Sequence, residues 1–416
     1  MRRKILEGGA LAIVDQGIVS LSNFVTGVIV AKAVAPDEFG TYSLFFTGLI
    51  LLSVLQNACV TGPLIVLGIR PQGIDNRDYF STQIHFQLLL GAAQLVSVIL
   101  ILSFFTETNT ELIASFAVCI FLFQLQELGR VILLTKMNMT SLLVLDVVTH
   151  SARMVVLLIF AGLGLLNSSV ALGAIALSSL IGILWAWSKR ELRITGSSQL
   201  RHLAKENWEF GRWLLLETLA NSASTQVYLF AMALWLDKQS VAVLAALQLL
   251  LNVMNVLVTG VTSFAIPVAR HRLTESGYQE WRHWLWRIGV FLTVAAAVFG
   301  LIISIAAKDL LSIIFTPFYA QFAHLVPLLA VVLCIQTANS VLSIAFHTAK
   351  MPQIGAADKI ASAAATMIII YPLLIGWGIV GSAVGLLITQ ILWMAVFLFY
   401  ILSGYLSRAR LDKKIG

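Results

Sequence analysis

The sequence is poor in charge and nearly free of cysteine. Charged residues make up 11% of the 416 residues and hydrophobic residues 59%, against about 25% and 45–50% in soluble domains. The three cysteines are odd in number and match no metal-binding spacing, so we expect small packing residues rather than metal ligands. The composition predicts a membrane protein, because no soluble core needs so much apolar surface.

Large loops and known cofactor motifs are also missing. No predicted loop is large, and no Walker phosphate loop, dinucleotide fingerprint, zinc spacing or nucleophile elbow occurs. Nothing indicates ATP hydrolysis, and no cofactor is expected apart from a coupling proton or sodium ion. A membrane polymerase or glycosyltransferase stays as an enzyme alternative, although such enzymes usually need a sizeable extramembrane domain for a second substrate.

Apolar stretches of helical length follow one another along the whole chain. A helix needs about 20 apolar residues to cross a membrane, and polar interruptions leave about twelve such stretches. The predicted fold class is an all-α integral membrane protein, since the short alternating strands of a β-barrel do not occur. The predicted spans are 9–33, 41–68, 83–105, 112–135, 142–164, 168–188, 209–235, 241–266, 285–307, 322–347, 355–376 and 379–403.

Basic residues alternate in density between the two sets of connections. One set is rich in Lys and Arg from Arg2-Arg3-Lys4 onward, whereas the other contains only Lys32, Lys238 and Lys308. Because basic loops stay in the cytoplasm, we expect both termini to be cytoplasmic, in a multi-pass protein of the cell inner membrane. Topology explains the basic excess, so the lipid bilayer is an expected partner and nucleic acid is not.

The two halves of the chain resemble each other weakly. Asp15 precedes Pro63 in the first half much as Glu217 precedes Pro267 in the second. Six spans return the chain to its starting side, so the repeats are parallel, which is a transporter design with the substrate between two bundles. The predicted six-helix lobes are residues 1–205 and 206–416.

Polar side chains follow one face of several predicted spans. In the first span Gln16 and Asn23 share a face, and Asp15 lies beside it. Such stripes are either interhelical hydrogen bonds, worth about 0.6 kcal/mol each, or the lining of a water-filled cavity. Later spans carry the stripes Glu217 and Asn221; Gln248, Asn252, Asn255, Thr259 and Thr262; and Gln336, Asn339, Ser343 and His347.

Ionisable residues inside spans favour the cavity interpretation, because a charge at a span centre costs at least about 2.5–3.5 kcal/mol. Glu127 and Arg130 lie one turn apart and can neutralise each other. Asp146 can do the same with His150 or Arg153. The complete set is Asp15, Glu127, Arg130, Asp146, Arg153 and Glu217.

The acidic residues differ in whether a basic residue lies near them in the sequence. Asp15 and Glu217 have no basic neighbour at helical spacing and are the preferred sites for a proton or cation. Asp358 and Lys359 lie near a span entrance, where we expect their charged ends to reach water.

Short motifs in both halves resemble those of the polysaccharide flippases. These are the O-antigen and exopolysaccharide transporters of the multidrug/oligosaccharidyl-lipid/polysaccharide exporter superfamily. The resemblance covers essentially the whole chain and implies a MATE-like pair of six-helix lobes working by alternating access. The motifs are Asp15-Gln16 with Asn23, Glu38-Phe39-Gly40-Thr41-Tyr42-Ser43-Leu44, Ala349-Lys350-Met351-Pro352 and Gly376-Trp377-Gly378-Ile379-Val380-Gly381-Ser382-Ala383.

The resemblance implies an oligosaccharide linked to polyprenyl pyrophosphate as cargo, with polysaccharide polymerase machinery as a further partner. Coupling to a proton or sodium ion would fall to Asp15 or Glu217, with Glu127 and Asp146 as further candidates. A small-molecule or multidrug cation antiporter of the same superfamily is the main alternative. The candidate substrate-binding residues are Arg130, Arg153 and Lys350 for the pyrophosphate or acidic sugars, and Gln16, Asn23, Asn252 and Asn255 for sugar hydroxyls.

Overall fold

The described residues of the chain form helices and no β-strand. They fall into two compact units, Met1–Leu219 and Ala220–Gly416. The boundary lies inside α8 (Leu200–Thr225), later in the chain than the division predicted at residue 205. The computed structural model describes residues 2–68, 76–103, 109–189, 200–349 and 352–403.

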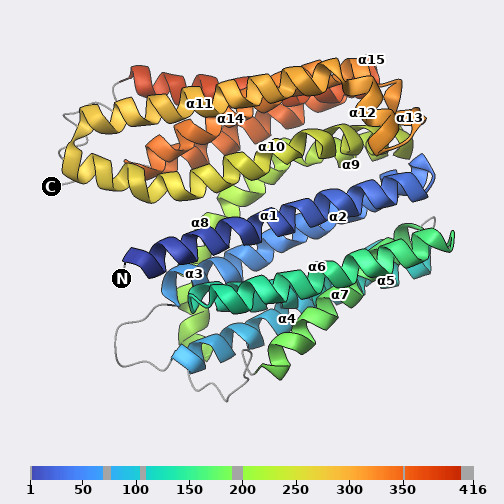
Figure 1. Cartoon of the computed structure of the whole chain (residues 1–416), viewed down its shortest axis with the longest axis horizontal. Coiled ribbons are helices and arrows are strands. Elements are labelled where there is room, and N and C mark those ends of the chain that lie inside the picture. The colour runs from blue at the N-terminus through green and yellow to red at the C-terminus, as the bar shows by residue number, and fades with distance from the viewer. Residues whose placement is uncertain (1, 69–75, 104–108, 190–199, 350–351, 404–416) are drawn as a thin grey trace. The chain divides into compact units, whose positions relative to one another are not determined.

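The first unit is a bundle of long helices (Figure 1). In it α5 packs against α4 and α7, and α1 packs against α6. A π-helical turn, Asn57–Thr61, separates α2 from α3. The helix bounds are α1 Arg2–Ala33, α2 Pro36–Gln56, α3 Gly62–Leu67, α4 Asn76–Ser103, α5 Thr110–Thr135, α6 Met139–Gly162 and α7 Ser168–Ser188.

The second unit is built around α14, which packs against α10, α11 and α15. A second π-helical turn, Arg272–Ser276, follows α10. The first unit has its π-helical turn at a similar place, after α2 and just before Pro63. The helix bounds are α9 Val227–Trp235, α10 Lys238–His271, α11 Tyr278–Ile305, α12 Ala307–Ile314, α13 Pro317–Ala320, α14 Val326–Thr348 and α15 Pro352–Leu402, with a 3₁₀ turn at Ala323–Leu325.

Side-chain caps fix where several helices begin. A helix start leaves backbone N–H groups without partners, and an Asn or Asp side chain can accept from one of them. Asn109, Asn138, Asn167 and Asp237 do so for α5, α6, α7 and α10. Glu38 adds a second acceptor at α7, because its carboxylate accepts from the Ser168 N–H at 3.0 Å. Glu38, in the 38–44 motif, therefore has a structural role.

Helix α15 is an antiparallel hairpin of two helices. The chain reverses at Gly378, whose φ of 56° and ψ of −132° are not helical. The arms pack closely, since a Cβ built at Gly381 would lie 1.9 Å from the Leu373 carbonyl oxygen. The hydroxyls of Thr366 and Thr389 join the arms at 3.0 Å. The arms match the spans predicted at 355–376 and 379–403.

Ten helical stretches among the described residues are long and apolar enough to cross a membrane. The last of them, Ala357–Leu402, contains both arms of the α15 hairpin and so covers two predicted spans. The span predicted at 209–235 is not among the ten, because its residues are divided between α8, which is too polar, and α9, which has only 9 residues.

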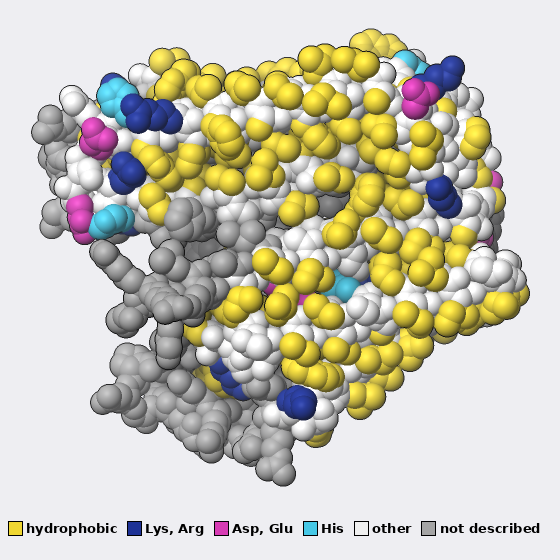
Figure 2. Space-filling view, in the orientation of Figure 1, with side chains coloured by type: hydrophobic (Ala, Val, Ile, Leu, Met, Phe, Trp, Pro, Cys, Tyr) yellow, Lys and Arg dark blue, Asp and Glu magenta, His cyan; other side chains and the backbone are white. Residues whose placement is uncertain are grey.

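Large hydrophobic side chains cover much of the surface (Figure 2). Leu402 and Ile305 are 85% and 78% exposed. In water such surfaces would cost free energy in proportion to their apolar area, whereas lipid accepts them. The chain is therefore a multi-pass membrane protein.

Candidate functional site

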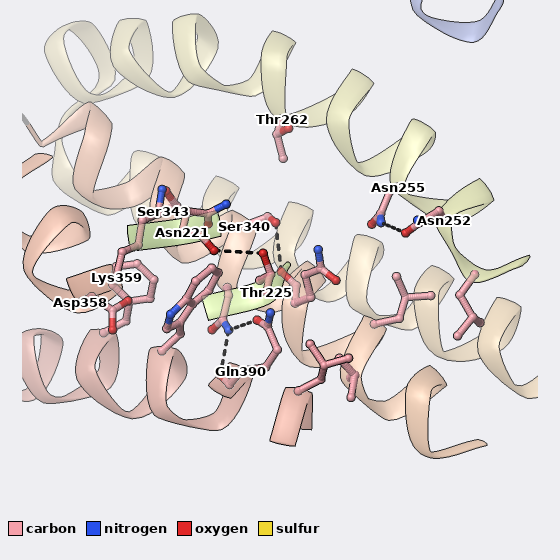
Figure 3. A pocket seen from close by; sticks show the side chains of 18 of the residues that line it. Asn221, Thr225, Asn252, Asn255, Thr262, Ser340, Ser343, Asp358, Lys359 and Gln390 are labelled. Atoms are coloured by element: carbon pink, nitrogen blue, oxygen red, sulfur yellow. Dashed lines mark hydrogen bonds between the residues drawn. The ribbon is translucent and has the colours of Figure 1, made fainter. Parts of the chain in front are cut away.

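A polar cavity of about 610 Å³ lies inside the second unit. Side chains of α8, α10, α14 and α15 line it. In Figure 3, Thr262 of α10 and Ser340 of α14 point into a common space. The cavity brings together polar stripes that the sequence places on separate spans, including Asn221, Gln248 and Gln336.

Amides make the main contacts in the cavity wall. The Asn255 amide donates to Asn252 Oδ1 at 2.8 Å. Across the cavity wall, Asn339 Nδ2 donates to the backbone carbonyl of Gln390 at 2.9 Å and to its side-chain oxygen at 3.0 Å. The predicted residues Asn252 and Asn255 thus line the cavity, and their role in binding stays a prediction.

Two polar lining residues on α15, Gln390 and Trp393, escaped the sequence analysis, and a third, Asp358, was expected at the water surface. Asp358 is only 1% exposed, so the expectation that it reaches water by snorkelling is wrong. A signal was present, because Asp358, Ser362 and Thr366 repeat at helical spacing. Gln390 and Trp393 had no comparable signal, because their arm packs against α14 and only the fold shows which face is polar.

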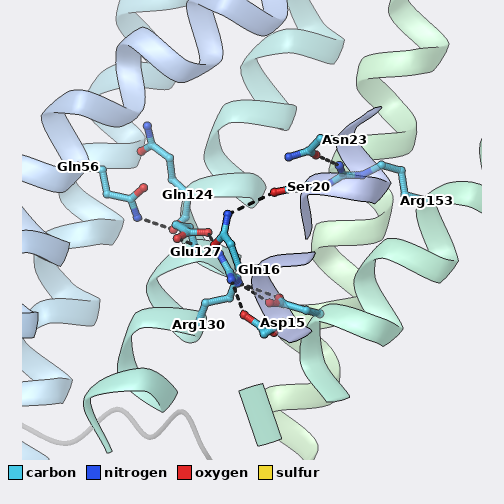
Figure 4. Close-up of polar contacts among 10 residues, drawn as sticks. Asp15, Gln16, Ser20, Asn23, Gln56, Gln124, Glu127, Arg130 and Arg153 are labelled. Carbon is cyan, nitrogen blue, oxygen red and sulfur yellow. Dashed lines mark hydrogen bonds and ion pairs between the residues drawn. The ribbon is translucent and has the colours of Figure 1, made fainter. Parts of the chain in front are cut away.

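The first unit instead contains a charged cluster centred on Arg130 of α5 (Figure 4). Its guanidinium lies 2.8 Å from the Asp146 carboxylate, 3.0 Å from that of Glu127 and 3.1 Å from that of Asp15. These carboxylates come from α6, α5 and α1. Three helices therefore meet at one guanidinium.

The cluster has more acidic than basic groups. The Asp146 side chain is 0% exposed and that of Glu127 is 30% exposed, so the cluster extends from the unit's interior toward its surface. If all four groups were ionised, three negative charges would face one positive charge. Such an excess is costly away from water, and a bound proton or cation would reduce it.

The structure shows the partners of the three acidic residues in this cluster. The Glu127–Arg130 pair is confirmed. The pairing of Asp146 with His150 or Arg153 is wrong, because Asp146 contacts Arg130. Asp15, which lacks a basic residue nearby in sequence, contacts Arg130 from 115 residues away. Helical spacing cannot reveal such partners on other helices.

Arg153 of α6 is a second buried cation with a different environment. It is 1% exposed, and its terminal nitrogen donates to Asn23 Oδ1 at 3.1 Å. Its Nε has no hydrogen-bond partner. Among the described residues no carboxylate lies within the 4.0 Å of an ion pair. Arg153 is therefore a buried guanidinium that no described carboxylate contacts directly.

Glutamines join helices beside the cluster. Gln56 donates to the Gln124 backbone carbonyl at 2.6 Å, and Gln87 donates to the Gln124 side chain at 3.1 Å. These bonds link α2, α4 and α5. For these amides, the interpretation of polar stripes as contacts between helices is confirmed.

The remaining predicted residues are Gln16, Glu217 and Lys350. Gln16 donates weakly to Ser20 on its own helix, at 3.4 Å. Glu217 is half-buried on α8 and is not one of the lining residues of the polar cavity. Lys350 lies outside the described residues.

Comparison with known proteins shows which fold this is. No family model and no curated protein matches the chain. An inward-facing multidrug resistance MATE family transporter of the MOP superfamily matches with a TM-score of 0.74 and 17% identity, over 95% of each chain. A MOP superfamily transporter from Pyrococcus furiosus, described as having a binding pocket of reverse polarity, matches at 0.66 and 15%, over 98% of this chain and 96% of its own.

The lipid II flippase MurJ, in an inward closed conformation, is also similar. It matches with a TM-score of 0.70 and 13% identity, over 95% of this chain and 87% of its own. Identities this low show the fold alone. The chain therefore has the MATE-like helical fold that multidrug transporters and a lipid flippase share.

Proposed function

We propose that this protein flips a lipid-linked oligosaccharide, attached to polyprenyl pyrophosphate, across the cell inner membrane for surface polysaccharide synthesis. It works by alternating access and is ion-coupled, with both termini cytoplasmic. The polar cavity is the observation that carries the proposal: half of its lining side chains carry amides or hydroxyls, which are the groups that hydrogen-bond sugars. The likeness to a lipid flippase supports it.

Arg153 is the proposed contact for the pyrophosphate. It has a buried guanidinium with an unpartnered Nε and no described acidic partner, and guanidinium groups bind phosphate through paired N–H donors. Arg130 carries positive charge too, but three carboxylates already surround it. We therefore assign Arg130 to the coupling cluster rather than to the cargo.

The coupling ion is proposed to bind at the Arg130 cluster. Asp15, Glu127 and Asp146 outnumber Arg130, so uptake of one proton or sodium ion brings the charge nearer to balance. Asp15 belongs to α1 while Asp146 belongs to α6. Uptake or release of the ion can therefore change how firmly these two helices are held together.

A small-molecule or multidrug cation antiporter is the second candidate. The excess of carboxylates in the first unit favours it, because acidic groups bind cationic drugs. The inward-facing multidrug MATE transporter matches with a TM-score of 0.74, against 0.70 for the lipid flippase. The amide-rich cavity of the second unit favours the oligosaccharide, since a hydrophobic drug site is lined mainly by apolar and aromatic side chains.

Deletion of the gene in the native host tests the proposal. The assay measures surface polysaccharide together with lipid-linked oligosaccharide trapped on the cytoplasmic leaflet, with the wild-type gene restored as the control. A flippase predicts loss of the polysaccharide and accumulation of the trapped precursor, both reversed by the wild type.

Other outcomes would point to other functions. Intact polysaccharide without a trapped precursor, combined with greater drug sensitivity, would favour the antiporter. Loss of polysaccharide with short, unpolymerised units already on the outer leaflet would favour the membrane polymerase.

A further inference from the structure

The polar cavity of the second unit holds buried polar atoms that no protein group satisfies. Asp358 Oδ1, Asn339 Oδ1 and Trp393 Nε1 all belong to lining residues and lack a hydrogen-bond partner. Asp358 and Asn339 are 1% and 3% exposed. Buried polar atoms are usually hydrogen-bonded, and leaving one unpaired costs about 1–3 kcal/mol. Three of them in one cavity indicate a ligand.

The unsatisfied atoms define what that ligand offers. The two oxygens accept hydrogen bonds, whereas the indole N–H donates one. A ligand that satisfies all three must therefore both donate and accept, as a hydroxyl does. The volume of about 610 Å³ lies within the range of about 300–1,000 Å³ usual for small-molecule sites, which is far more than a single ion needs.

The charge of the cavity wall selects among polyhydroxylated ligands. Asp358 is the acidic residue of the lining and the adjacent Lys359 is the basic one, while His347 is the third ionisable side chain and the other polar lining groups are amides, hydroxyls and an indole. Among the described lining residues there is no arginine. An acidic sugar would thus meet a buried carboxylate with only a lysine to offset it, and an amino sugar would meet that lysine. Neither sign of charge is favoured.

Trp393 adds an apolar surface to the same wall. It is half-buried and lines the cavity together with Gln390, three residues earlier on the same arm of α15. An indole presents a flat apolar face with a polar edge. A sugar ring has the matching character, with C–H groups on its faces and hydroxyls around its rim.

We infer that this cavity is a binding site for the neutral sugar part of the cargo, with Asp358 and Trp393 as its specificity-determining residues. The inference rests on the proposed function and narrows it. The second unit recognises uncharged hydroxyl-bearing rings, and the charged part of the cargo is bound elsewhere.

Binding of free sugars to the purified full chain in detergent tests the inference without lipid, gradient or transport. The probes are a neutral trisaccharide, maltotriose, and two charged trisaccharides, trigalacturonate and the trimer of glucosamine. Saturation-transfer NMR and calorimetry at about 10 mM sugar cover weak dissociation constants near 1 mM. We expect maltotriose to bind and both charged probes to bind at least about tenfold more weakly.

Two pairs of variants locate the site. Trp393→Phe and Asp358→Asn should each weaken maltotriose binding by about tenfold. Trp377→Phe, at an exposed tryptophan on the same hairpin, and Asp309→Asn, at an exposed aspartate, should bind like the wild type. Because Trp393→Phe keeps an aromatic ring in place, it is informative even if Asp358→Asn folds poorly.

The inference is overturned if no probe binds, if a charged trisaccharide binds more tightly, or if Trp393→Phe binds maltotriose like the wild type. Each of these results leaves the gene-deletion experiment unaffected. Conversely, maltotriose binding with no defect in the deleted strain would keep the sugar site and reject the flippase.

Discussion

The two units bury their polar groups in contrasting ways. In the first unit a guanidinium and three carboxylates contact one another. In the second unit amides and hydroxyls line much of an open cavity, where Asn339 Oδ1, Asp358 Oδ1 and Trp393 Nε1 have no protein partner. A buried charge without a counter-charge costs far more than a buried amide without a hydrogen bond. The charges of the Arg130 cluster therefore pair within the protein, whereas the cavity of the second unit leaves polar atoms for a ligand to satisfy.

Removing the central charge of the first unit should have the largest effect. Arg130→Gln leaves three carboxylates without their cation, one of them fully buried. Breaking a buried ion pair from one side costs about 3–5 kcal/mol, so we expect a much lower unfolding temperature and little protein in the membrane. Thermal unfolding of the purified protein in detergent measures this.

The matched control is Lys308→Gln, which removes an exposed positive charge and should not change stability. The double variant Arg130→Gln with Asp146→Asn should recover part of the loss. An unchanged unfolding temperature for Arg130→Gln would mean that the carboxylates are already neutral, and the contrast between the units would disappear.

Arg153 should behave differently from Arg130, although both are buried arginines of the first unit. Arg153→Met keeps an unbranched apolar stem without the guanidinium and breaks no described ion pair, so stability should hold. Hydrogen bonds to charged groups contribute about 1.5–3 kcal/mol, so flipping of the pyrophosphate-linked cargo should fall roughly tenfold or more. Fluorescent lipid-linked oligosaccharide in proteoliposomes reports the flipping rate.

Arg282→Met, at an exposed arginine, is the control for the loss of a positive charge. Normal flipping by Arg153→Met would remove Arg153 from the binding site. A loss of stability as large as that of Arg130→Gln would show that Arg153 has a structural counter-charge.

Asp15→Asn should affect coupling more than folding, because Arg130 keeps its contacts with Glu127 and Asp146. Couplings between sites are typically about 1–3 kcal/mol, or roughly five- to 150-fold. We expect the response of transport to pH or sodium to disappear while a basal rate remains. Transport measured at stepped pH and sodium concentrations, with Asp309→Asn as the control, shows this. If transport by the variant still responded to pH or sodium, Asp15 would not be a coupling residue.

The smallest effect is expected in the cavity wall of the second unit. Asn255→Ala removes one hydrogen bond, to Asn252, at an exposed position. Such bonds between membrane residues average about 0.6 kcal/mol, so the unfolding temperature should barely change, while cargo binding weakens severalfold. Equal transport by the variant and the wild type would show that this end of the cavity does not contact the cargo.

The architecture was largely predictable from the sequence, because apolar stretches of helical length dominate it. The predicted all-α, MATE-like fold is confirmed. Stripes such as Asn221, Gln248 and Gln336 predicted polar faces correctly, and the fold places them around one cavity.

The partners of charged residues could not be predicted in the same way. Helical spacing found Glu127 for Arg130, one turn away, but Asp15 reaches Arg130 from another helix. Proximity in sequence also misplaced Asp358, because its nearness to the start of a span suggested water although the fold buries it. Contacts between helices depend on rotation and packing, and neither follows from one span's periodicity.

The tight turn at Gly378 bears on how the chain is inserted into the membrane during synthesis. The two arms of α15 have no polar loop between them, and so no charged residue on that side fixes their orientation. We therefore expect the two arms to insert as one hairpin, oriented by basic residues beyond its two ends in the sequence, such as Lys350, Arg408 and Arg410. The Gly378 backbone, with φ of 56° and ψ of −132°, is nearly restricted to glycine, so this one residue sets the turn on which pairwise insertion depends.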